Sequence, residues 1–175
     1  MNTRPLTIKT DRLELRAMEL SDSDNMIAIL TNSEVAITYM VPKFESHEQA
    51  FKMFESILHL SRSVDRFVYG IYLDKVLIGL INEVDVGDDY VELGYVIHPS
   101  YKDNGYATEA VMSAINILFD MGIQSVKAGA FENNIASMRV MEKCGMQKCD
   151  YTEEIEYNGQ IHTCIIYMIK KHPND

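Results

Sequence analysis

Hydrophobic and polar residues follow one another along this chain in patterns that predict helices and strands in turn. The clearest pattern begins at Ala107, from which apolar residues fall at i, i+3, i+4, i+7, i+8, i+11 and i+12. This spacing predicts a helix with one apolar face, and Gly122 is expected to end it. Weaker spacing of the same kind predicts further helices between Ser21 and Leu30 and over 47–60 and 135–144.

Runs that alternate apolar and polar residues, or are almost wholly apolar, predict strands. These strands are expected over 11–18, 66–73, 76–86, 90–97, 125–131 and on both sides of Asn158-Gly159. The Asn-Gly pair favours a type I′ hairpin turn, which gives three expected cross-strand pairs: Tyr157 with Gln160, Glu153 with Cys164, and Cys149 with Met168. The order of elements predicts one α/β (α+β) domain, with a mixed sheet and helices on both faces.

Length and composition support a single globular domain. The chain has 175 residues, of which 47% are hydrophobic and 24% charged, and this balance is too apolar for a disordered protein. The formal charge of −10 argues against a nucleic-acid-binding protein, because such proteins need a basic surface. A cationic partner is compatible with this charge.

The cysteines and the apolar runs indicate the compartment. Cys144, Cys149 and Cys164 are odd in number and none forms a CxxC pair with metal-ligand spacing, so we expect free thiols and no bound metal. No apolar run approaches the ~20 residues of a membrane helix, and residues 1–5 lack the apolar core of a signal peptide. We therefore expect a cytoplasmic protein that does not enter membranes.

Candidate chemistry lies between Tyr95 and Ala110, where a buried strand passes through a short loop into the clearest helix. A helix start offers unpaired backbone N–H groups that attract phosphate. Gly105 permits conformations that point successive N–H groups at an anion, and Ala107 leaves room for a bulky ligand. Neither a Walker A loop nor a GxGxxG fingerprint is present. By itself the local pattern favours a simple turn before a helix over a pyrophosphate site.

Several segments together resemble the GNAT N-acetyltransferases. Residues 102–107 (KDNGYA) are similar to the family's acetyl-CoA loop, [Q/R]xxGx[G/A]. Four further segments resemble the branch that acetylates N-termini of ribosomal proteins: TDRLELR at 10–16, ELGY at 92–95, NIAS at 134–137 and EKCG at 142–145. The resemblance implies a single GNAT domain over 1–175, with a mostly antiparallel mixed sheet of about seven strands flanked by helices.

The resemblance also implies acetyl-CoA as co-substrate and a set of residues around it. The implied cofactor-binding residues are Val96, Ile97, His98, Lys102, Asp103, Asn104, Gly105, Tyr106, Ala107, Thr108, Asn134 and Ser137. Backbone N–H groups near Val96 and His98 would face the pantetheine arm and the thioester carbonyl, where two strands separate. Asn134 would hold the pantetheine, and Ser137 would protonate the leaving thiolate. The alternative for Ser137 is a helix N-cap or first-turn residue.

Glu92 is the candidate general base. An alkyl ammonium must lose a proton before it can attack a thioester, and a partly buried glutamate can have its pKa raised toward the working range. The alternative is a solvated strand residue or an ion-pair partner, and Asp85 and Glu83 are fallback bases.

Three departures from the family pattern affect these expectations. Lys102 stands where Gln or Arg is usual and provides a point charge rather than a fork. Asp103 stands where glycine is common and places a carboxylate near the expected pyrophosphate. Met141 occupies the position at which some GNAT enzymes carry a catalytic tyrosine, which favours Ser137 or water as the acid.

The function implied is acetyl transfer to a primary amine, with the segment 32–65 expected to wall the acceptor site. The acceptor is either the N-terminal amine of a ribosomal or other protein, or a small molecule such as a polyamine, an antibiotic or an amino acid. A module that binds acyl-CoA without catalysis is the alternative from another class. The sequence leaves the oligomeric state open, with a homodimer among the alternatives.

Overall fold

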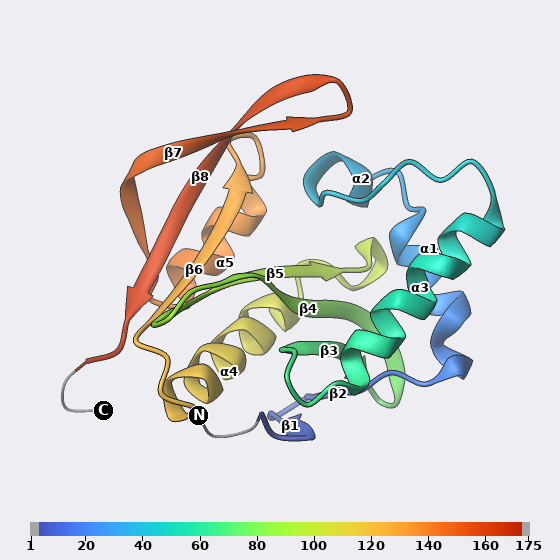
Figure 1. Ribbon diagram of the computed structural model, residues 1–175, viewed down its shortest axis with the longest axis horizontal. Helices are drawn as coiled ribbons and strands as arrows, with labels where there is room; N and C mark the ends of the chain where they lie inside the picture. Colours follow the sequence, from blue (N-terminus) through green and yellow to red (C-terminus); the bar gives the residue numbers. More distant parts are fainter. Residues whose placement is uncertain (1–3, 173–175) are drawn as a thin grey trace.

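A computed structural model describes residues 4–172 of the chain, in which one eight-stranded sheet is covered by helices (Figure 1). The strands are β1 (Thr7–Lys9), β2 (Leu13–Arg16), β3 (Val68–Leu73), β4 (Val76–Val86), β5 (Tyr90–Ile97), β6 (Ser125–Phe131), β7 (Gln147–Tyr157) and β8 (Gln160–Lys170). The helices are α1 (Ser23–Leu30), α2 (Val35–Thr38), α3 (His47–Arg62), α4 (Tyr106–Asp120) and α5 (Ile135–Lys143), with single 3-10 turns η1 (Leu20–Asp22) and η2 (Pro99–Tyr101).

The strand order is β1-β2-β3-β4-β5-β6-β8-β7, and within residues 4–172 only the β5–β6 pair is parallel. The expected mixed, mostly antiparallel sheet is therefore confirmed. The sheet has one strand more than expected, because the three residues of β1 pair with β2. Three residues are too few to show an alternating pattern in the sequence.

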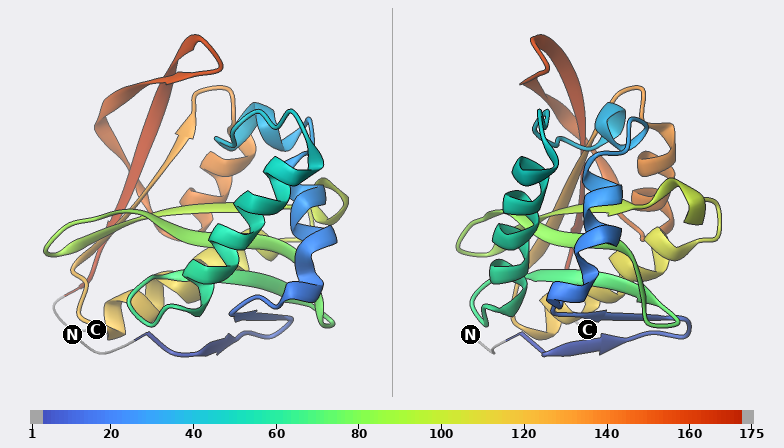
Figure 2. Two further views of the ribbon diagram at one scale, coloured as in Figure 1. Left: turned by 45° about the vertical axis from the view of Figure 1, so that its right-hand side comes forward. Right: turned by 90° about the vertical axis from the view of Figure 1, so that its right-hand side faces the viewer.

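Helices cover both faces of the sheet, as the element order predicts (Figure 2). Helices α4 and α5 pack on one face in a core that includes Ile78, Ile81 and Leu118. Helices α1 and α3 pack on the other face, with Met26, Phe54 and a second set of sheet residues. The short helix α2, which the sequence does not predict, stands beside the tip of the β7–β8 hairpin.

The C-terminal hairpin has the predicted turn but a different register at its far end. Asn158 and Gly159 both have positive φ, and two of the expected pairs, Tyr157–Gln160 and Glu153–Cys164, form. The expected pairing of Cys149 with Met168 is wrong, because β7 gains two residues between Lys148 and Thr152 and Gln147 faces Met168 instead. The three cysteines are free thiols.

The sheet opens between β5 and β6. These strands pair only over Tyr90–Glu92 and Ser125–Lys127, although β5 continues to Ile97 and β6 to Phe131. Beyond that point β6 pairs only with β8. The opening exposes one edge of β5 inside the molecule and determines where a ligand can enter the sheet.

Candidate active site

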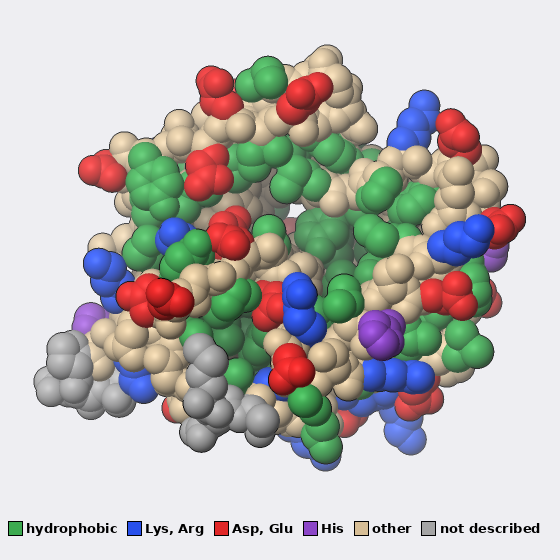
Figure 3. Space-filling model, viewed as in Figure 1, with side chains coloured by type: hydrophobic (Ala, Val, Ile, Leu, Met, Phe, Trp, Pro, Cys, Tyr) green, Lys and Arg blue, Asp and Glu red, His purple; other side chains and the backbone are tan. Residues whose placement is uncertain are grey.

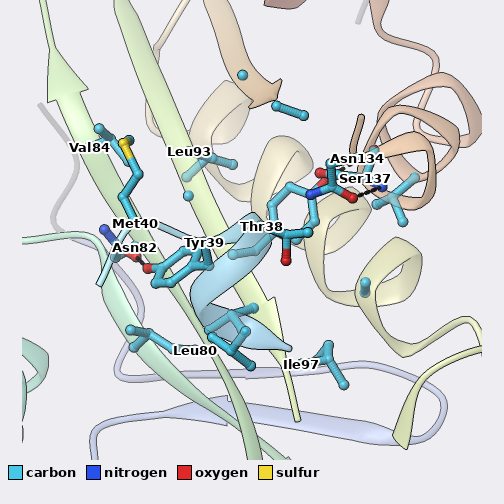
Figure 4. Close-up of a pocket in the computed structure, with 18 of the residues that line it drawn as sticks. Thr38, Tyr39, Met40, Leu80, Asn82, Val84, Leu93, Ile97, Asn134 and Ser137 are labelled. Atoms are coloured by element: carbon cyan, nitrogen blue, oxygen red, sulfur yellow. Dashed lines mark hydrogen bonds between the residues drawn. The ribbon is translucent and has the colours of Figure 1, made fainter. Parts of the chain in front are cut away.

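A cavity of about 750 Å³ occupies the opening between β5 and β6. It extends from the loop before α4, past the separated strands, to α2 and α3 on the other face. Figure 4 shows Asn134 and Ser137 on one side of this space and Tyr39 and Met40 on the other. One continuous space therefore joins the expected cofactor loop to the segment expected to wall the acceptor.

The loop before α4 forms the start of this cavity. Gly105 is the helix N-cap and has φ of 78°, a left-handed conformation that favours glycine. The cavity is lined here by Lys102, Asp103, Gly105, Tyr106, Ala107 and Thr108. The unpaired N–H groups of the first turn of α4 lie beside it. Asn104 is absent from the lining, because its side chain donates to the Tyr101 and Lys102 carbonyls within the loop.

The charges of this loop are only partly compensated. The Lys102 ammonium lies 3.2 Å from a carboxylate oxygen of Glu34, which belongs to the segment between α1 and α2. Asp103 has φ of 63° and forms no ion pair within the described chain. From this loop itself, a bound pyrophosphate would therefore meet one cation, Lys102, that it must share with Glu34, and one carboxylate, Asp103, without an ion-pair partner.

Backbone donors of β5 point in two directions. The His98 N–H donates to Ile78 O on β4 at 2.8 Å, so the expectation that it faces the thioester is wrong. Strand N–H groups alternate in direction, which assigns Val96 to the same side as His98. The N–H groups of Tyr95 and Ile97 therefore face the opening. The His98 side chain caps η2 by accepting from the Ser100 N–H, which is a structural role.

Glu92 lies where the two strands begin to separate. It pairs with Lys127 on β6 and lines the cavity. Burial raises the pKa of Glu92, the nearby Glu153 and Asp85 raise it further, and Lys127 lowers it. Glu92 forms no ion pair or hydrogen bond through its side chain among the described residues. Its carboxylate is therefore available to accept a proton from a ligand.

The two fallback bases are already engaged. Glu83 forms an ion pair with Arg66 and accepts from the Phe67 N–H at 3.0 Å. Asp85 accepts from the hydroxyl of Tyr90 and does not line the cavity. The geometry therefore favours Glu92 among the three carboxylates that the sequence offers.

Asn134, Ser137 and Tyr95 form a small polar group at the start of α5. The Asn134 side chain caps the helix by accepting from the Ser137 N–H at 3.1 Å, a bond drawn in Figure 4. The Ser137 hydroxyl lies 2.7 Å from that of Tyr95, which also donates to the Ser137 carbonyl. Burial raises the pKa of Tyr95, so it stays protonated. Met141 is fully buried and offers no proton.

Helix α2 and its flanks wall the other end of the cavity and are fixed at two points. The Tyr39 hydroxyl donates to the side-chain oxygen of Asn82 on β4 at 2.9 Å, and burial raises the pKa of Tyr39 to about 12. The hydroxyl of Tyr157 donates to the Ala36 carbonyl at 2.9 Å and lies 3.1 Å from the Val41 carbonyl. The strand β4 and the β7–β8 hairpin thus hold this segment between them.

The chain matches the Acetyltransferase (GNAT) domain family over residues 12–147. It belongs to the GNAT family of acetyltransferases. Its sequence is 31% identical over 170 residues to the uncharacterized N-acetyltransferase YoaA of Bacillus subtilis. The matched region covers 94% of this chain and 96% of the relative. This level of similarity supports an acetyltransferase enzyme.

Solved structures share the fold of this acetyltransferase. The Salmonella typhimurium enzyme that modifies the N-terminal serine of ribosomal protein L7/L12 aligns with a TM-score of 0.79 at 17% identity, covering 98% of this chain and 100% of that one. The microcin C7 self-immunity acetyltransferase MccE, solved with acetyl-CoA and AMP, aligns with a TM-score of 0.81 at 16% identity, covering 95% and 97%. At these identities the likeness establishes the fold alone.

Most of the site residues expected from the sequence meet at the cavity of this GNAT acetyltransferase. Its lining includes Glu92, Val96, Ile97, Asn134, Ser137 and the loop residues 102, 103 and 105–108, and it excludes His98 and Asn104. Sequence reasoning missed Tyr95, Tyr39 and Asn82. The only signal for Tyr95 was its place in the ELGY segment, two positions after the inward-facing Leu93.

Residues 4–172 contain no group of acidic, histidine and cysteine side chains that could hold a metal ion. No helix in that range is long and apolar enough to cross a membrane.

Proposed function

We propose that this enzyme transfers an acetyl group directly from acetyl-CoA to a primary amine, with Glu92 as general base. The observation that carries the proposal is the single cavity that contains both the loop before α4 and the Glu92 carboxylate. An ammonium at Glu92 would meet a thioester arriving from the loop without crossing any barrier of side chains. Gly94 and Gly129 support this path, because neither places a side chain in the opening.

The residues of the loop fit the pyrophosphate of acetyl-CoA. The left-handed Gly105 and the free N–H groups of the first turn of α4 form an anion site of backbone donors. Ala107 keeps the approach open, and Lys102 supplies a positive charge once it leaves Glu34. These features attract an anion locally although the whole chain is acidic.

Each atom of the reaction has a candidate partner. Glu92 takes a proton from the ammonium, directly or through water, and the neutral nitrogen attacks the thioester carbonyl. The N–H groups of Tyr95 and Ile97 stabilise the oxyanion in the opening. The C–N bond forms first and gives the tetrahedral oxyanion; as this collapses, the C–S bond breaks and the nitrogen loses its second proton. The thiolate takes a proton from Ser137 or from water, and the proton released by nitrogen replaces the one given up.

The acceptor that we propose first is a protein N-terminus. The motifs at 10–16, 92–95, 134–137 and 142–145 support it, since they resemble the branch that acts on ribosomal proteins. The fold neighbour that modifies an N-terminal serine and the charge of −10, which suits a basic partner, point the same way. A small amine is the second candidate, because α2 narrows the acceptor end, where the hydrogen bonds of Tyr39 and Tyr157 hold it in place.

A release assay for the CoA thiol tests the proposal. The purified enzyme receives acetyl-CoA and either N-terminal peptides of ribosomal proteins or small amines, and mass spectrometry follows the acetylated product. We expect thiol release that depends on the amine and a product acetylated at nitrogen. Tight binding of acetyl-CoA with no transfer to any amine would contradict the proposal and favour a binding module.

A further inference from the structure

The acceptor end of the cavity offers one free carboxylate. Apart from the loop before α4 and from α5, its lining contains three charged side chains: Arg66, Glu83 and Glu92. Arg66 and Glu83 neutralise each other as an ion pair. Among the described residues that line this end, Glu92 is therefore the single carboxylate that an ammonium can approach. The other charged lining residues belong to the loop before α4 or to α5.

The rest of this end is mostly apolar and partly open to solvent, with Thr38, Ser56 and Asn82 among its polar side chains. Its wall includes Met40 beside α2, Met53 on α3, Val84 on β4 and Ile155 on β7. Met40 and Val84 are 48% and 55% exposed, which is high for large apolar side chains at the edge of a cavity. Figure 3 shows a hollow on this face with hydrophobic side chains around it. An apolar rim of this kind indicates a surface that a ligand covers.

From these observations we infer that the acceptor is a primary amine carried on one aliphatic or aromatic group, with no second cationic centre nearby. This inference rests on the proposed function and restricts the range of acceptors that the enzyme would use. A second ammonium held against this apolar wall would lose water without gaining a carboxylate from the lining, which is unfavourable, so a polyamine or an aminoglycoside fits this end less well. The same chemistry is presented by a free alkyl or arylalkyl amine and by a peptide whose first residue is apolar.

A panel of acceptors tests the inference at saturating acetyl-CoA. Its arms are 2-phenylethylamine and isoamylamine, peptides that differ only in a first residue of Phe, Met or Ser, and spermidine and kanamycin. We expect the best apolar acceptor, whether a free amine or the Phe or Met peptide, to have a kcat/KM about tenfold or more above those of spermidine, kanamycin and the Ser peptide. Burial of one apolar side chain supports a ratio of this size. Preference for spermidine, kanamycin or the Ser peptide overturns the inference alone. Absence of transfer to every amine overturns the proposed function as well.

Matched variants test whether the lining residues Val84 and Met40 contact the apolar group of the acceptor. Val84→Asp should lower kcat/KM for the preferred apolar amine about tenfold and leave the KM for acetyl-CoA unchanged. Val86→Asp is the control, because Val86 is 49% exposed on the same strand and does not line the cavity. Met40→Glu and its control Ile37→Glu repeat the comparison near α2. Equal effects of the lining and control variants would overturn the inference.

Discussion

The guanidinium of Arg12 lies 2.7 Å from the carboxylate of Glu109, which is in the first turn of α4. The same carboxylate accepts from the Thr10 hydroxyl at 2.6 Å, and Arg12 also donates to the Asn104 carbonyl at 2.9 Å. The segment before β2 is thus tied to the loop that begins α4. The physical role of the T-x-R part of the 10–16 motif is to fix the position of this loop.

Removal of this tie should weaken cofactor binding. Arg12→Ala is expected to raise the KM for acetyl-CoA about two- to fivefold, the effect of an exposed ion pair of about 0.5–1 kcal/mol, with kcat retained. Steady-state kinetics measure both constants. Arg16→Ala is the matched control, because Arg16 pairs with Glu14 and Glu19 instead. Equal changes in the two variants would show that Arg12 does not act through the loop.

Glu109 should also make stability depend on pH. Burial raises the pKa of Glu109, but hydrogen bonds from Thr10 and Arg12 together lower it below the ordinary value. A lowered carboxyl pKa stabilises the native state above the unfolded value of about 4.3. That stabilisation is lost as pH falls through the native pKa. Glu109→Gln should therefore lower the urea midpoint at pH 7, and the difference from the native enzyme should shrink toward pH 3.

Glu92 should have the opposite effect on stability. Because its pKa is raised in the folded enzyme, the native state holds this proton more tightly than the unfolded chain does. Ionised Glu92 therefore destabilises the native state at neutral pH. Glu92→Gln should unfold at a higher urea concentration at pH 7 while its acetyl transfer falls. A lower midpoint would show that the carboxylate has a structural partner in solution.

Asp103 is expected to oppose the cofactor. A carboxylate beside a helix start that binds phosphate weakens the anion site by about 0.3–1 kcal/mol. Asp103→Asn retains a residue that tolerates the left-handed conformation and should lower the Kd for CoA about two- to fivefold in calorimetry. Asp120→Asn, at the far end of α4, serves as the control. An unchanged Kd in Asp103→Asn would mean that this carboxylate points away from the phosphates.

The contact between Tyr95 and Ser137 gives a separate test of the proton donor. Ser137→Ala should lower kcat about tenfold or less, because the thiol of CoA is already fairly acidic. Tyr95→Phe should lower it by a smaller factor, because it removes the contact with the Ser137 hydroxyl, a hydrogen bond of about 1 kcal/mol, together with the bond to the Ser137 carbonyl. If Tyr95 acts through Ser137, the double variant should match Ser137→Ala. Additive losses would assign the two hydroxyls independent roles.

Patterns formed by residues near one another in the sequence predicted many of the helices and strands. The apolar spacing from Ala107 gave α4, and Asn158-Gly159 gave the hairpin turn, because both depend on local conformation. The direction of the His98 N–H was predicted wrongly, since it depends on which carbonyl of β4 lies opposite. The two extra residues between Lys148 and Thr152 in β7 have no local signature.

The acceptor end was the least predictable part of the site. The Tyr39–Asn82 bond joins residues 43 positions apart, and the Tyr157–Ala36 bond joins residues 121 positions apart. Such pairs follow from tertiary packing, and a single sequence carries no signal for them. Glu92, by contrast, could be singled out because its motif places it on the strand before the cofactor loop.

The pH dependence of kcat/KM for the amine, in the native enzyme and in Glu92→Gln, tests the central claim most directly. With Glu92 as base, the native profile should fall on the acidic side with a pKa above the ordinary glutamate range, in line with its raised value. Glu92→Gln should lose about 10²–10⁴-fold at neutral pH and recover as pH approaches the amine's own pKa of about 10. Profiles of equal shape and height in the two enzymes would contradict the account.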